Sequence, residues 1–134
     1  MLLVDTNILF ALLLDTDWSQ SARELHARDP DWRTESHAPV ELSNVLTRYV
    51  RVRKITVGQA VAAIDYAQQL IGSGLCEVPH SDALIVAVDS GVSAYDARFL
   101  CAAKLLGVRL ITEDKKLRKA APRHTVSLAE ALAS

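Results

Sequence analysis

The feature that most constrains the fold is a repeated alternation of short apolar runs with segments of helical length. The runs, of which MLLV at the start is the clearest, do not alternate strictly between apolar and polar residues, which is typical of strands buried on both faces of a parallel sheet. Helices must then cover both faces of that sheet. The sequence therefore predicts an α/β fold, a three-layer α/β/α sandwich with a central parallel sheet. The expected strands are residues 1–4, 31–36, 75–78, 108–112 and 125–126.

Caps, prolines and glycines mark the expected helices. Pro39 suits the first turn of one helix, Thr56 begins another, and Gly107 ends a third. The expected helices are residues 6–14, 39–49, 56–71, 81–91, 93–107 and 114–121, with a last one beginning near residue 127. A further helix, which Asp17 or Ser19 can cap, is expected to run to about residue 28. No linker, internal repeat or low-complexity segment divides the chain, so residues 1–134 are expected to form a single domain.

Composition narrows the functional classes. The chain has 15 Lys and Arg against 16 Asp and Glu, so its net charge does not favour nucleic acid, and phosphate binding would need a local patch or a metal ion. Cys76 and Cys101 each follow a leucine and are expected to be core thiols in a reducing cytosol. The apolar stretch 8–14 is far shorter than the ~20 residues of a membrane span. We expect a soluble, cytoplasmic protein with no membrane contact.

Four acids fall where open parallel sheets bind ligands, at the carboxyl ends of strands or on helices that begin beside them. Each has an ordinary structural explanation as well, as a helix cap or as a negative charge that complements a helix dipole. These candidates are Asp5, Glu41, Asp96 and Asp114.

Taken together, the four acids point to a metal ion. Four carboxylates at one edge would repel one another and raise at least one pKa unless a cation lay among them. An oxygen-only ligand set without His or Cys favours Mg²⁺ or Mn²⁺ over zinc. Such a cluster can activate water and neutralise charge that develops on a phosphodiester.

Small polar residues next to these acids suit a supporting role. They can orient the carboxylates, or they can act only as helix caps. They are Thr6, Asn7, Ser93 and Thr112. Glu113 lies on the alternate side of the chain from Asp114 and is expected to face solvent. Lys115 and Lys116 follow Asp114 and are candidates for contacts to RNA phosphates, although a run of charges is also typical of a solvated helix face.

Four segments together resemble the PIN-domain ribonucleases, and most of all the single-domain VapC toxins of bacterial toxin–antitoxin pairs. They are VDTNIL at the start, a Glu inside the helix near one third of the chain, SAYDARFLCAAKLLG, and LITEDKKL near the end. The resemblance covers essentially the whole chain. It implies that Asp5, Glu41, Asp96 and Asp114 bind Mg²⁺ or Mn²⁺, with Asn7, Ser93 and Thr112 as polar support.

The same resemblance implies an endoribonuclease toxin that blocks translation by cutting RNA. It also implies a homodimer, and an antitoxin whose C-terminal segment lies in a groove near the first helices. The alternatives are a housekeeping RNA-processing or DNA-acting nuclease, or a nucleic-acid-binding module without activity. A haloacid-dehalogenase-like phosphatase would need a second Asp where this chain has Asn7, and no Walker or G-x-S-x-G motif is present.

Overall fold

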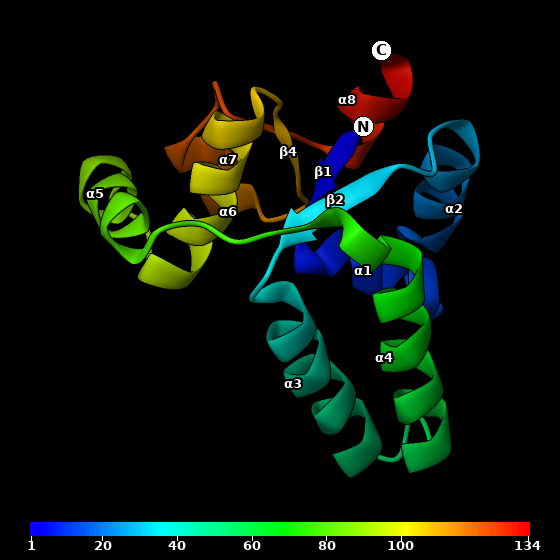
Figure 1. The fold of residues 1–134 in the computed structure, drawn as a ribbon. Coiled ribbons are helices and arrows are strands. Elements are labelled where there is room, and N and C mark those ends of the chain that lie inside the picture. Colours follow the sequence, from blue (N-terminus) through cyan, green and yellow to red (C-terminus); the bar gives the residue numbers. More distant parts are fainter.

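A five-stranded, all-parallel sheet forms the centre of the computed structural model, which describes residues 1–134 (Figure 1). The strand order is β3-β2-β1-β4-β5. The strands are β1 (Leu2–Val4), β2 (Trp32–Glu35), β3 (Leu75–Cys76), β4 (Leu110–Ile111) and β5 (Thr125–Val126). The predicted parallel sheet is therefore confirmed.

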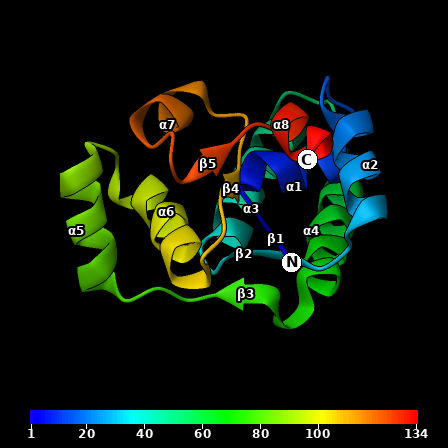
Figure 2. The ribbon, with the colours of Figure 1, turned by 90° about the horizontal axis from the view of Figure 1, so that it is seen from above.

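Eight helices surround the sheet. They are α1 (Thr6–Leu13), α2 (Ser19–Arg28), α3 (Ala38–Arg51), α4 (Val57–Ile71), α5 (His80–Ser90), α6 (Ala94–Leu106), α7 (Lys115–Ala120) and α8 (Leu128–Ala133). Helices α5, α6 and α7 lie on one side of the sheet, and α1, α2 and α4 lie on the other (Figures 1 and 2). This arrangement is the predicted three-layer sandwich.

Local sequence signals account for most helix boundaries. Thr56 accepts a hydrogen bond from the backbone N–H of Gln59, whose side chain accepts one from Thr56 N–H, which makes a complete capping box. Ser127 and Glu130 form the same box at α8. Gly107 ends α6 in a left-handed conformation with φ of +67°, which a side chain would oppose.

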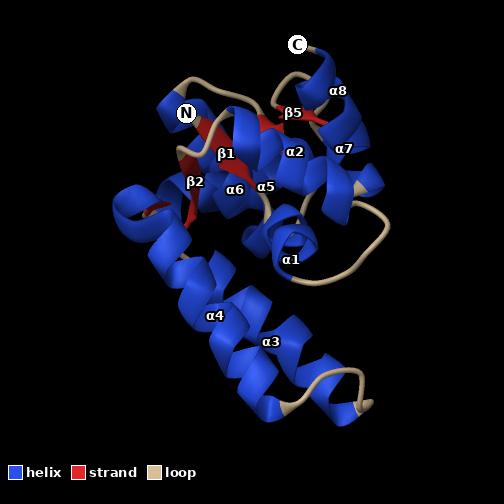
Figure 3. Ribbon diagram, turned by 90° about the vertical axis from the view of Figure 1, so that its right-hand side faces the viewer, coloured by secondary structure: helices blue, strands red, loops and turns tan.

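The main core lies on both faces of the sheet. Leu3 and Val4 of β1 and both residues of β4 are buried, and the largest buried side chains include Trp32 and Phe99. Helices α3 and α4 extend away from this core as an antiparallel pair (Figure 3). A second small core, which contains Leu42, Leu46, Ala63 and Ala67, holds that pair together.

The structure differs from the sequence-based expectations in the start of α5, the length of β3 and the exposure of Cys76. Helix α5 begins at His80, one residue before the expected Ser81, because Pro79 occupies the N-cap position. Strand β3 is only two residues long, against the four expected. Both cysteines are free; Cys101 is buried, whereas Cys76 is partly exposed. None of the helices has the length and apolarity that a membrane crossing requires.

Candidate metal centre at the sheet edge

The candidate site lies where the order of the sheet reverses. From β1 the chain continues to β2 on one side, whereas β4 pairs with β1 on the other side. In open parallel sheets, the crevice at such a reversal, beyond the carboxyl ends of the strands, is where ligands bind. Asp5 directly follows β1, and Thr112 directly follows β4, so both stand at this crevice.

Asp5 is held in one orientation by three hydrogen bonds. Its Oδ1 accepts from the backbone N–H of Thr6 at 2.7 Å. Its Oδ2 accepts from Thr112 Oγ1 at 2.7 Å and from Asn7 Nδ2 at 3.2 Å. Only 7% of Asp5 is exposed. These contacts fix the carboxylate before any ligand arrives.

Asn7 and Thr112 extend this network to Asp114. Asn7 Nδ2 donates to Thr112 Oγ1 at 3.2 Å, and Asn7 Oδ1 accepts from the backbone N–H of Glu113. Thr112 Oγ1 accepts from the backbone N–H of Asp114 at 3.1 Å. Asp114 Oδ1 in turn caps α7 by accepting from Leu117 N–H. Two distant chain segments, 5–7 and 112–114, therefore form one hydrogen-bonded unit.

Glu41 reaches the same edge from α3. Its Oε2 accepts a long hydrogen bond of 3.4 Å from Thr6 Oγ1. Its Oε1 is buried and has no hydrogen-bond partner. A buried carboxylate oxygen without a partner is costly, so it calls for a cation, a proton or a water molecule.

Asp96 lies in the first turn of α6. Ser93 is the N-cap of this helix, and its Oγ accepts from the backbone N–H of Asp96 at 3.0 Å. Ser93 therefore makes the S-x-x-D cap that was one of its two predicted roles.

The four acids influence one another electrostatically. Burial, followed by the charges of Asp96 and Asp114, raises the pKa of Asp5 to about 6. Burial and the charge of Asp5 raise the pKa of Glu41 to about 7. Burial and the charge of Asp114 raise the pKa of Asp96. The carboxylates therefore share one region whose negative charge is not balanced by a cation.

The residues fit a hard divalent cation in their chemistry, but they do not form a finished ligand shell. All the candidate donors are carboxylate oxygens, and Glu41 Oε1 is free to bind. No three acidic, His or Cys side chains converge closely enough to hold a metal ion as they stand. The carboxylates therefore influence one another electrostatically without forming a ligand shell.

Comparisons with known proteins settle the family. A model of the PIN domain matches residues 2–122. The chain belongs to the PIN domain family. PIN domains are generally nucleases and generally use divalent metal ions. No curated protein sequence matches this PIN domain.

Three solved structures share the fold of this PIN domain. The crystal structure of PAE2754 from Pyrobaculum aerophilum has a TM-score of 0.76 and 22% identity, covering 98% of this chain and 89% of that one. A toxin–antitoxin complex from Klebsiella pneumoniae has a TM-score of 0.70 and 18% identity, covering 96% and 98%. FitAcB from Neisseria gonorrhoeae has a TM-score of 0.66 and 14% identity, covering 95% and 96%.

A fifth acid of this PIN domain, Glu35, was not among the residues predicted from sequence. It ends β2, is 0% exposed, and pairs with Arg98 of α6 at 2.8 Å. Its charge contributes to the raised pKa of Glu41. The available signal was its position, because Glu35 lies at the carboxyl end of an expected strand, as Asp5 does.

The expectation for Glu113 was wrong. Its side chain is only 14% exposed, since Oε1 accepts from the backbone N–H of Leu128 and Oε2 lies 3.5 Å from Arg118 Nη1. Arg118 also donates to the carbonyl oxygen of Thr112 at 2.8 Å. Lys115 and Lys116, by contrast, are exposed at the start of α7.

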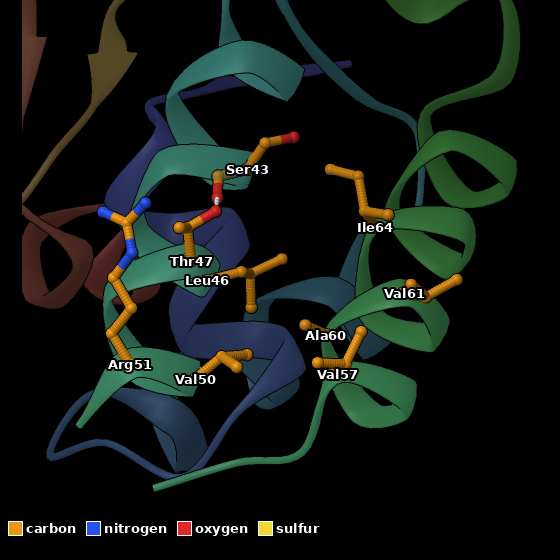
Figure 4. A pocket seen from close by; sticks show the side chains of 9 residues that line it. All are labelled: Ser43, Leu46, Thr47, Val50, Arg51, Val57, Ala60, Val61 and Ile64. Atoms are coloured by element: carbon orange, nitrogen blue, oxygen red, sulfur yellow. Dashed lines mark hydrogen bonds between the residues drawn. The ribbon is translucent and has the colours of Figure 1, made fainter. Parts of the chain in front are cut away.

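An apolar groove of about 360 Å³ lies between α3 and α4 (Figure 4). Leu46 and Val50 of α3 face Val57, Val61 and Ile64 of α4 across it. None of its lining residues is acidic. The groove has no groups for phosphodiester chemistry and is better suited to contact with another protein.

Proposed function

We propose that residues 1–134 are a single-domain, cytoplasmic, Mg²⁺- or Mn²⁺-dependent endoribonuclease, the toxin of a VapBC-type pair that blocks translation. The observation that carries this proposal is the acidic sheet edge of a chain in a nuclease family. Asp5 is buried, Glu41 is half-buried, and the buried Oε1 of Glu41 has no hydrogen-bond partner. Their negative charge is best explained by a divalent cation and a phosphodiester that bind there.

In this proposal the cation is held by four carboxylates, those of Asp5, Glu41, Asp96 and Asp114. A divalent cation at this place would supply positive charge to the phosphate and make nearby water more acidic. Thr112 and Asn7 keep Asp5 from rotating, and Thr6 orients Glu41.

The reaction also needs a general base, because the attacking water must lose a proton as it bonds to phosphorus. Glu41 Oε1 is free either to bind the cation or to take up that proton. Attack in line with the 3′-oxygen would leave 5′-phosphate and 3′-hydroxyl ends. Lys115 and Lys116, exposed beside Asp114, are placed to contact neighbouring phosphates of the RNA.

We propose two protein partners, an antitoxin and a second copy of the chain. One protein of similar fold was solved as a toxin–antitoxin complex, which supports an antitoxin for this chain. Exposed apolar side chains on α5, which are Leu84, Ile85 and Val88, support a homodimer. Such a row of exposed apolar residues is unusual for a chain that remains alone.

The decisive test is a cleavage assay on matched RNA and single-stranded DNA. We expect RNA cleavage with Mg²⁺ or Mn²⁺, none with EDTA, and none by Asp5→Asn. Asp65→Asn, which changes an exposed acid on α4, is the matched control and should cleave as the wild type does. Cleavage of DNA alone, or equal cleavage by Asp5→Asn, would refute the proposal. Growth arrest on expression, relieved by the product of an adjacent gene, would distinguish a toxin from a housekeeping enzyme.

A further inference from the structure

Glu35 stands beside Asp5 at the same edge of the sheet. The register of β1 and β2 pairs Leu3 with Arg33, and continuing it by two residues places Asp5 next to Glu35. The Glu35 side chain is 0% exposed. A buried carboxylate needs partners, and Glu35, unlike Glu41, has them for both oxygens.

The two oxygens of Glu35 contact different parts of the fold. Oε1 accepts from Arg98 Nε at 3.0 Å and lies 2.8 Å from Arg98 Nη2. Oε2 accepts from the backbone N–H of His37 at 2.6 Å. Glu35 therefore joins Arg98 of α6 to the residue that begins α3.

Arg98 is fixed from its other side as well. Its Nη1 lies 3.0 Å from His80 Nδ1, which must accept because a guanidinium can only donate. Its Nη2 donates to the carbonyl oxygen of Val78 at 3.3 Å. The Arg98 side chain is only 14% exposed. With all these contacts the guanidinium has one defined position.

The helices joined in this way carry two of the proposed cation ligands. His37 is the N-cap of α3, and its carbonyl oxygen accepts from the backbone N–H of Glu41. Arg98 lies two residues after Asp96 on α6. The Glu35–Arg98 pair is thus a short connection between the helix of Glu41 and the helix of Asp96, which are otherwise far apart in sequence.

We infer that the Glu35–Arg98 ion pair is a positioning device that sets the spacing of Glu41 and Asp96 for one divalent cation. This inference rests on the proposed function. Stability alone is a weak explanation, because a buried ion pair seldom stabilises a fold more than apolar residues of the same size. A metal site, by contrast, needs its ligands held to within about 0.5 Å, and outer contacts commonly decide the affinity.

If Arg98 acted only through its charge, one variant would change cation binding in the opposite direction. Arg98→Met leaves Glu35 as an additional anion near Glu41, so charge alone would tighten cation binding. A lost connection between α3 and α6 would weaken it. Arg98→Lys keeps the positive charge but loses the forked contact to Glu35, so charge alone would leave binding unchanged.

The test is Mn²⁺ binding to the whole protein, measured from the electron paramagnetic resonance signal of free Mn²⁺. We expect Arg98→Met to weaken binding about 10–100-fold and Arg98→Lys about 10-fold. Glu35→Gln, which retains an acceptor for His37 N–H, should also weaken it. Arg23→Met removes the exposed ion pair with Asp15 and is the matched control, with no expected change.

Tighter binding by Arg98→Met, or unchanged binding by both Arg98→Lys and Glu35→Gln, would overturn the inference. Circular dichroism identifies the variants that fold, and Arg98→Lys carries the test if Arg98→Met does not. Failure of the proposed function looks different, because the wild type would then bind Mn²⁺ no better than Asp5→Asn does. If the wild type binds Mn²⁺ and Asp5→Asn does not, the cation site is established, and the Arg98 and Glu35 variants then test the ion pair alone.

Discussion

Two groups of carboxylates share the carboxyl edge of this sheet, and they differ in whether the protein supplies a cationic partner. Glu35 is 0% exposed, but it accepts three hydrogen bonds, from Ser36, His37 and Arg98, and Arg98 also balances its charge. Asp5 and Glu41 have no cationic partner, and their pKa values are raised to about 6 and about 7.

This difference separates structure from function. A carboxylate with its own arginine has no need of an external ion, whereas carboxylates that repel one another gain most from one. Replacing the unpaired acids and replacing the members of the Glu35–Arg98 pair should therefore affect different properties of the protein. Loss of the unpaired acids should cost activity even at saturating Mn²⁺, whereas loss of the paired residues should cost stability and affinity for Mn²⁺.

The largest effect is expected for Asp5→Asn. At saturating Mn²⁺ we expect its RNA cleavage to fall by at least about 100-fold, since even outer contacts to metal ligands are commonly worth 10–100-fold. Arg98→Lys should instead recover most of its activity when Mn²⁺ is raised, because its ligands are intact and only displaced. The measurement is the cleavage rate as a function of Mn²⁺ concentration. An equal loss in both variants at saturation would erase the distinction between the groups.

The next effect is on folding. Arg98→Met should lower the free energy of unfolding by about 3–5 kcal/mol, because it leaves a buried carboxylate without its cation. Glu35→Leu combined with Arg98→Met should recover much of that loss, since the buried charge is gone from both sides. Urea unfolding in EDTA measures both. A double variant as unstable as the single one would show that the contacts of Glu35 to His37 matter more than charge pairing.

In contrast to Arg98→Met, Glu41→Gln should raise the free energy of unfolding of the metal-free protein. A carboxyl whose pKa is raised on folding contributes full stability below its unfolded pKa, and that contribution is lost as pH rises through the folded pKa. For Glu41 the window runs from about pH 4.5 to about pH 7. Above it we expect a gain of roughly 1 kcal/mol, a small value because water screens a half-buried group.

The measurement is the free energy of unfolding of the wild type and of Glu41→Gln at several pH values across this window. The two should be equally stable near pH 4 and should diverge by pH 8 in EDTA. Added Mn²⁺ should remove the advantage of the variant by stabilising the wild type more. A constant difference at every pH would mean that the carboxyl does not titrate differently in the folded state.

Most of the fold was accessible from sequence because its signals are local. Ser93, Thr56 and Gly107 define helix ends through contacts with residues at most four positions away. The acids at strand ends followed from the same reasoning, since a parallel sheet brings the ends of its strands to one edge.

The remaining details depend on long-range partners that no local pattern reveals. Glu35 and Arg98 are 63 residues apart, and nothing in either neighbourhood indicates their pairing. Glu113 was expected in solvent from the alternation of side chains, but it accepts a hydrogen bond from Leu128 N–H, fifteen residues later. The finer geometry of the acids is equally hidden, because it depends on packing between helices.

The smallest expected effect concerns the basic start of α7. Lys115 and Lys116 are exposed, whereas Arg118 is held by Thr112 and Glu113, so the two lysines are free to contact phosphate. Both lysines are replaced with Ala in the Asp5→Asn variant, which is expected not to cleave the RNA during the measurement. The double replacement should weaken RNA binding. The slope of log affinity against log salt should fall by about 0.7 for each lost contact to single-stranded RNA.

Arg53→Ala with Lys54→Ala removes equal charge at the far tip of the α3–α4 pair and is the matched control. If RNA crosses the acidic edge, only the α7 variant should change the slope. The same change in both would indicate diffuse attraction rather than a defined path. An unchanged slope in the α7 variant would mean that RNA reaches the acids from another side, and the lysines would then be a solvated helix face.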